Sequence, residues 1–142
     1  MEQTVPTYKL LDHTADLCIE VVGGTLKHLY ENAGNALMHL MLSGKPLGNV
    51  GTVDISVTGQ DYADLMVRWL GELLYLFEGD RRIPARIMIN KLSPKHLEAR
   101  VETVPFDPDR FEVNYEIKAV TYHQIDVSQK AGRWVARVIF DI

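Results

Sequence analysis

The stretch from Asp61 to about Glu78 constrains the fold more than any other part of the chain. Asp61 can cap a helix through its side-chain oxygen, and the apolar residues after it recur at helical spacing over more than one face. These residues are Leu65, Met66, Trp69, Leu70, Leu73, Leu74, Leu76 and Phe77. So wide an apolar surface is typical of a core helix, so we predict here the most deeply buried helix of the fold rather than a hydrophobic cofactor box.

A second helix is predicted upstream by the same reasoning. Thr25 can cap it, the apolar residues from Leu26 to Met41 keep helical spacing, and the segment Ser43-Gly44-Lys45-Pro46 ends it. The stretches 16–22 and 53–57 instead alternate apolar and polar residues, which predicts strands.

The sequence pattern changes after Gly79-Asp80, where short runs of alternating apolar and polar residues are separated by turn residues. They cover approximately 84–92, 96–104, 111–119, 121–128 and 133–140. Two helices followed by many strands predict an α+β fold, with a mixed or mostly antiparallel sheet and the two helices packed on one face. Since 142 residues is an ordinary length for one domain, we expect a single domain over 1–142.

Charge and cysteine content narrow the function classes. The net charge is −4 and the basic residues form no long cluster, so we expect contact with RNA only indirectly, through a protein partner. Cys18 is the only cysteine and lies in a predicted strand, where we expect a buried apolar residue rather than a reactive thiol. No signal segment or membrane-spanning apolar run is seen, so we expect a cytoplasmic protein that does not act at membranes.

The motifs of common enzyme classes are missing: there is no phosphate-binding loop, dinucleotide fingerprint, G-x-S-x-G or zinc-spaced Cys/His set. Polar clusters remain, and the first is Asp12-His13-Thr14-Ala15-Asp16. It gathers two carboxylates, an imidazole and a hydroxyl within five residues. Its structural alternative is a turn in which Asp12 and Thr14 bond the backbone and His13 is solvated.

The second cluster is Phe140-Asp141-Ile142, which sets a side-chain carboxylate beside a terminal carboxylate. Such groups repel unless a cation lies between them, and calcium or magnesium accepts these oxygen ligands. The structural alternative is a frayed, solvated end. The third cluster is the segment 118–123, where Lys118 is either a surface lysine of an edge strand or a cation offered to a partner's phosphate or carboxylate.

Together these segments resemble the archease family over nearly the whole chain. The matching residues are Asp12 to Asp16 with Leu17 and Ile19, Gly24-Thr25-Leu26, Tyr30-Glu31-Asn32-Ala33, the pattern from Leu65 to Tyr75, Lys118 to His123, and the pattern from Trp134 to Ile142. The chain departs from the family at Cys18, where Gly is frequent, and at Gly71, where Asn is frequent. Because glycine inside a helix costs about 1 kcal/mol relative to Ala, we expect Gly71 to mark close packing.

The resemblance implies an accessory protein of tRNA splicing. Its partner is the GTP- and manganese-dependent RNA ligase that joins a 2′,3′-cyclic phosphate or 3′-phosphate end to a 5′-hydroxyl end. The resemblance implies that the protein promotes guanylylation and repeated turnover of this ligase and is not itself an enzyme. It also implies a divalent cation (calcium first, magnesium or manganese as alternatives) bound by Asp16, Asp141 and the terminal oxygens of Ile142. The candidates for facing the partner are Asp12, His13, Lys118 and His123.

Two other functions stay open. A small metal-dependent hydrolase or phosphotransfer enzyme would use Asp16, His13 and Asp141, since a metal bound by carboxylates can activate water. General chaperone-like binding would need a broad exposed apolar patch.

Overall fold

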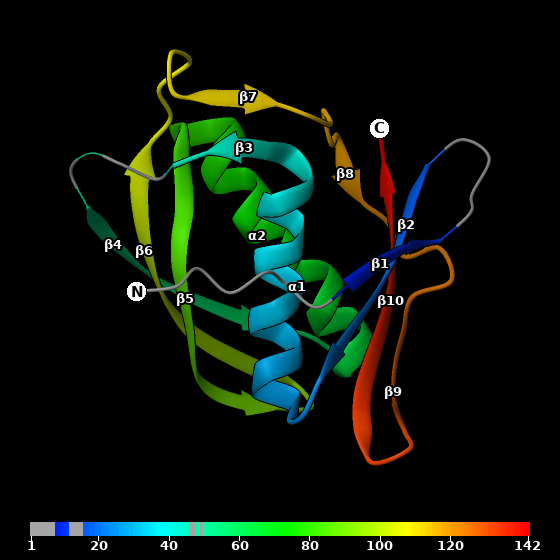
Figure 1. Cartoon of the computed structure of the whole chain (residues 1–142). Coiled ribbons are helices and arrows are strands. Elements are labelled where there is room, and N and C mark those ends of the chain that lie inside the picture. The colour runs from blue at the N-terminus through cyan, green and yellow to red at the C-terminus, as the bar shows by residue number, and fades with distance from the viewer. Residues whose placement is uncertain (1–7, 12–15, 46–47, 49) are drawn as a thin grey trace.

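The two helices lie between two antiparallel sheets in the computed structural model, which describes residues 8–11, 16–45, 48 and 50–142 (Figure 1). The helices are α1 (Leu26–Met41) and α2 (Tyr62–Asp80). The strands are β1 (Tyr8–Leu11), β2 (Leu17–Gly23), β3 (Leu42–Gly44), β4 (Gly51–Thr58), β5 (Arg82–Ser93), β6 (His96–Pro105), β7 (Phe111–Val113), β8 (Ala119–Val120), β9 (Asp126–Lys130) and β10 (Arg133–Asp141). The α+β class is confirmed.

The strands divide into three sheets, where the sequence predicted one. The largest has the order β1-β2-β10-β8, and β9 also pairs with β10, so β8 and β9 share one edge of that strand. A second sheet has the order β4-β6-β5, and β3 pairs with β7 in a small third sheet. Helix α1 contacts β2 and β5, while α2 contacts β5, β4, β8 and β9, so each helix touches both of the larger sheets.

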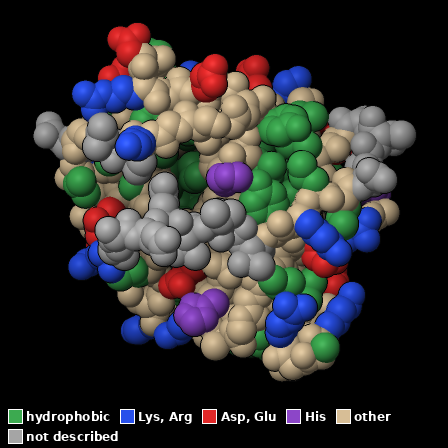
Figure 2. All heavy atoms as spheres, viewed as in Figure 1, with side chains coloured by type: hydrophobic (Ala, Val, Ile, Leu, Met, Phe, Trp, Pro, Cys, Tyr) green, Lys and Arg blue, Asp and Glu red, His purple; other side chains and the backbone are tan. Residues whose placement is uncertain are grey.

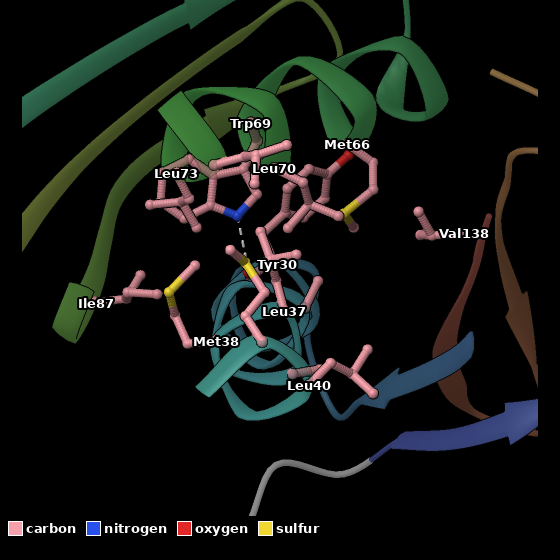
Figure 3. Packing of buried hydrophobic residues seen from close by; sticks show 14 of the residues in the cluster. Tyr30, Leu37, Met38, Leu40, Met66, Trp69, Leu70, Leu73, Ile87 and Val138 are labelled. Atoms are coloured by element: carbon pink, nitrogen blue, oxygen red, sulfur yellow. Dashed lines mark hydrogen bonds between the residues drawn. The ribbon is translucent and has the colours of Figure 1, made fainter. Parts of the chain in front are cut away.

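Helix α2 is buried as the sequence predicted. Its residues Leu65, Trp69, Leu70 and Leu73 are completely buried, because one sheet covers it on each side. The indole Nε1 of Trp69 donates a hydrogen bond of 2.9 Å to the carbonyl oxygen of Tyr30 on α1 (Figure 3). That bond satisfies the polar atom of a buried side chain and fixes the two helices against each other.

Both predicted helix caps are confirmed. The side chain of Thr25 accepts a hydrogen bond from the backbone N–H of His28, and the side chain of Asp61 accepts one from the N–H of Asp64. Each bond satisfies one of the donors that a helix start leaves free. Within the described ranges, no helix is long and apolar enough to cross a membrane.

Two predicted strands are wrong over much of their length, although their apolar alternation is real. The run 111–119 is a strand only at β7 and again at β8, because the chain leaves the small sheet after Val113 and joins β10 only at Ala119. The run 121–128 is interrupted by a turn closed by the bond from the Ile125 N–H to the Tyr122 carbonyl, and Gln124 there has a positive φ of 53°. Strands β1 and β3 were not predicted.

The carboxylate of Asp64, in the first turn of α2, accepts hydrogen bonds from several residues. Arg68 donates from Nε to both carboxylate oxygens at 3.0 and 3.1 Å, and the N–H of Gln60 donates to Oδ2 at 2.9 Å. The hydroxyl of Tyr122, which is far away in the sequence, donates to Oδ1 at 2.7 Å. These bonds, that of Tyr122 first, favour the ionised form and hold the pKa of Asp64 below its ordinary value.

Gly71 does not mark close packing, since a Cβ added there would meet nothing within 4 Å. We therefore predict that Gly71→Ala stabilises the protein by about 0.5–1 kcal/mol, the helix-propensity difference between the two residues. The measurement is the free energy of unfolding in urea. Gly34→Ala in α1 is the matched control, because its Cβ would lie 2.7 Å from Ile87 Cδ1 and 2.8 Å from Leu73 Cδ1, so we expect destabilisation there. Destabilisation by Gly71→Ala would contradict the prediction.

The lowered pKa of Asp64 predicts a pH-dependent contribution to stability. A carboxyl whose pKa is lower in the folded than in the unfolded protein stabilises the fold above its unfolded pKa, near 3.9, and loses that contribution as the pH falls through the folded value. Asp64→Asn should therefore lower Tm at pH 7, and the deficit should shrink as the pH falls below about 4. Thermal melts at several pH values test this, with Glu72→Gln on the same helix as the control. A deficit that is equally large at pH 7 and pH 2.5 would count against it.

Candidate functional site

Three strands begin or end together at one end of the largest sheet, and we call this end of the strands the edge. The last ladder pair of β2 and β10 is Leu17 with Phe140, and on the other side of β10, Asp141 pairs with Ala119 at the start of β8. Asp16 precedes Leu17 by one residue and Asp141 follows Phe140, so both acidic residues lie directly beyond the last pair of this ladder. Segments from both halves of the sequence thus converge on this edge.

The residues next to the acidic pair in the sheet are apolar and buried. Strand alternation puts Asp141 on the same face of the sheet as Ile139, which pairs with Cys18. Ile139 is 1% exposed and Cys18 is completely buried, so the expectation that Cys18 is a packed apolar residue is confirmed. Asp16 is half-buried and Asp141 is exposed, while Ile142 is 39% exposed.

Lys118 lies beside these residues. Its backbone N–H donates a hydrogen bond of 2.8 Å to the carbonyl oxygen of Asp141, and its side chain is exposed. His123 lies further along the same segment, past β8, and its N–H donates to Oγ1 of Thr121. The structure therefore brings Asp16, Asp141, Ile142 and Lys118 to one edge and leaves His123 at the start of the turn toward β9.

The edge offers oxygen ligands, which suit hard cations such as calcium and magnesium. The side chains of Asp16 and Asp141 supply two carboxylates there. In the part of the chain that the structure describes, no group of three or more His, Cys, Asp and Glu side chains could hold a metal ion. The remaining sequence candidates, Asp12 and His13, lie outside the described residues.

Sequence reasoning missed a second polar cluster, in which Tyr122 reaches Asp64 and Arg68. These three line an open depression of about 370 Å³ with Gln60, Asp61, Ala63 and Ile125. The spacing of Asp64 and Arg68 at i and i+4 is a local signal for an ion pair on a helix. Nothing local links either of them to a tyrosine that lies 58 residues away from Asp64.

Charged side chains of both signs are interspersed on the face seen in Figure 2, where Lys and Arg form no continuous basic surface. Apolar side chains form one larger group and several smaller ones on that face. The large apolar side chains exposed among the described residues come from separate elements and include Leu10, Val50, Tyr75, Val113, Tyr115, Tyr122 and Ile142.

Comparisons with known proteins agree with one another. The Archease protein family matches residues 8–142. Protein archease of Methanosarcina acetivorans is 34% identical over 140 residues, which cover 95% of each chain. The solution structure of protein 1598 from Methanobacterium thermoautotrophicum superposes with a TM-score of 0.72 at 24% identity, over 97% of this chain and 100% of that one.

A crystal structure from Thermotoga maritima, described as an archease and possible chaperone, has a TM-score of 0.64 at 21% identity and covers 100% of this chain and 98% of its own. At these low sequence identities, the two structures support a similarity of fold and nothing more. The family match and the sequence relative go further: this chain belongs to the archease family.

Proposed function

We propose that this protein activates the RNA-splicing ligase that joins tRNA halves, by promoting guanylylation of the ligase and its repeated turnover. The proposal is carried by the meeting of Asp16, Lys118 and Asp141 at one sheet edge, in a chain of the archease family. These residues come from the separate segments on which the family resemblance rests. In this proposal the protein joins no RNA by itself and contacts RNA only through the ligase.

The edge suits an accessory role because its charged groups face outward. Asp141 and Lys118 are exposed, so a docked ligase can reach both a carboxylate and an ammonium group. Docking would remove water from these charges, and their interactions with the nucleotide and phosphate groups of the ligase would then become stronger. Lys118 can pair with a phosphate or a carboxylate of the partner.

The same edge is the proposed cation site. A ladder continued by one pair past Leu17 and Phe140 would set Asp16 opposite Asp141. Opposite residues of an antiparallel ladder have Cβ atoms about 4.5–5.5 Å apart, a separation at which two carboxylates can bind one cation. Asp16 and Asp141, with the main-chain oxygens of Ile142, would hold it, with calcium as the first candidate and magnesium or manganese as alternatives. A bound cation would offset the repulsion between the two carboxylates.

The functional prediction concerns the ligase reaction. The wild-type protein should raise the rate of ligase guanylylation with GTP and manganese and allow several rounds of RNA joining. Asp16→Ala and Asp141→Ala should each lose most of this activation. Mutating a residue that only hydrogen-bonds to a metal ligand already lowers metal affinity or activity by about 10- to 100-fold, and these two changes would remove the proposed ligands themselves. The fold should survive, because neither change opens a core cavity.

Asp109→Ala is the matched control, because Asp109 is an exposed acidic residue of the turn before β7, away from the edge. It should activate the ligase as well as the wild type. The proposal fails if the folded wild-type protein leaves both single- and multiple-turnover rates of its cognate ligase unchanged. Joining of RNA by the protein alone would instead favour an enzyme.

The cation prediction is independent of the ligase. A ligand that binds only the folded protein at a hundred times its Kd stabilises it by about 2.7 kcal/mol, which is several degrees in Tm. Thermal melts with calcium, magnesium or manganese should therefore lie above melts with a chelator, and Asp141→Ala should abolish the difference. Equal midpoints with all three metals at millimolar concentration would rule out the site.

A further inference from the structure

Among the described residues, the segment that carries Lys118 pairs with another strand along one side only, that of β10. Its backbone bonds run to β10, from the Lys118 N–H to Asp141 at 2.8 Å and from the Thr121 N–H to Ile139 at 3.0 Å. Between these bonds β8 is only two residues long, and residues 114–118 before it form no helix or strand. The ladder with β10 is therefore short, and beside it Ile117, which is completely buried, and Val120 anchor the segment in the core.

The segment also contacts α2 directly, through β8, and one side-chain hydrogen bond adds a polar link to that helix. The hydroxyl of Tyr122 donates to Oδ1 of Asp64 at 2.7 Å. Asp64 is itself held in place by α2, because Arg68 and the N–H of Gln60 donate to its carboxylate and its own N–H donates to the cap residue Asp61. The carboxylate is therefore a fixed point on a helix whose other face is packed in the core.

The bond to Asp64 is of the strong type. Hydrogen bonds to an ionised carboxylate are shorter and stronger than those between neutral groups, and the pKa of Asp64 is lowered while that of Tyr122 is raised, first of all by this bond. Tyr122 contributes little to the core, since it is 55% exposed. Removing its hydroxyl would take away the polar link to α2 without leaving a cavity, while the contacts of β8 and β9 with α2 would remain.

We propose that Tyr122 is a positioning residue: its bond to Asp64 links the segment 118–123 to helix α2 and thereby sets the place of Lys118 at the edge that meets the ligase. The inference rests on the proposed function, because Tyr122 would affect ligase activation only through the position of Lys118. Tyr122 itself needs no contact with the ligase or its RNA. The segment is then held from two sides, by β10 and by α2.

The test variant is Tyr122→Phe, which removes only the hydroxyl. We expect it to lower the maximal rate of ligase guanylylation several-fold, less than the about 100-fold that a 1 Å misplacement can cost. The metal-induced shift in Tm and the concentration for half-maximal activation should stay close to wild type. Asp64→Asn, which keeps an acceptor oxygen but loses the charge, should lose less activation.

Tyr75→Phe is the matched control, because Tyr75 is 66% exposed on the same helix and its hydroxyl makes no hydrogen bond in the described part of the chain. It should activate like the wild type. In a Lys118→Ala background, Tyr122→Phe should cause no further loss, since the two changes remove the same contribution. Amide hydrogen exchange at Lys118 should be faster in Tyr122→Phe, while exchange at Trp69 in the core stays unchanged.

The outcomes separate this inference from the proposed function. If the wild type activates and Lys118→Ala is impaired, normal activation by Tyr122→Phe overturns the positioning role. An equal loss in the wild-type and Lys118→Ala backgrounds also overturns it, because Tyr122 then acts independently of Lys118. If the wild type itself fails to activate, the proposed function falls, and unchanged exchange at Lys118 in Tyr122→Phe shows that the tyrosine does not hold the segment.

Discussion

Helix α2 has to be covered on more than one side, and much of the structure is a consequence of that requirement. Its buried residues lie on more than one face, and the Trp69 indole can satisfy its N–H only against another element, which is the Tyr30 carbonyl of α1. One cover is the sheet β4-β6-β5, built from the middle of the chain. The other cover is the largest sheet, which contacts α2 through β8 and β9 and contacts α1 through β2 and β10.

The candidate site follows from this second cover. Because β2 and β10 pair antiparallel, the residue before β2 and the last residue of β10 come together at one edge of the sheet. Asp16 and Asp141 are therefore neighbours for reasons of packing, before any cation or partner is considered. Their closeness is unfavourable for two carboxylates by themselves, which is the physical reason to look for a cation or a basic partner group at this edge.

Local chemistry was enough to predict the helices, because the caps Thr25 and Asp61 and the apolar spacing act within a few residues. Local chemistry did not predict which strands pair with one another. The alternation from Phe111 to Ala119 suggested one strand, yet that stretch pairs first with β3 and later with β10, and alternation carries no information about this change. Gly71 was misjudged for a similar reason, since the space around a helical glycine depends on distant segments. Likewise, Asp64 and Arg68 were visible as a helical pair, while Tyr122 was not.

The openness of the edge bears on the choice between an activator and an enzyme. Metal-dependent hydrolysis or phosphoryl transfer by a single small protein needs a site in which water is controlled and the reacting groups are held. Here Asp141, Lys118 and His123 are all exposed, and the segment that carries the last two has little regular structure of its own. In the proposed function, the docked ligase would cover this edge and close it. The same exposure that weakens the charges in the free protein would let them act on a docked ligase, which is the arrangement that the proposed activator role requires.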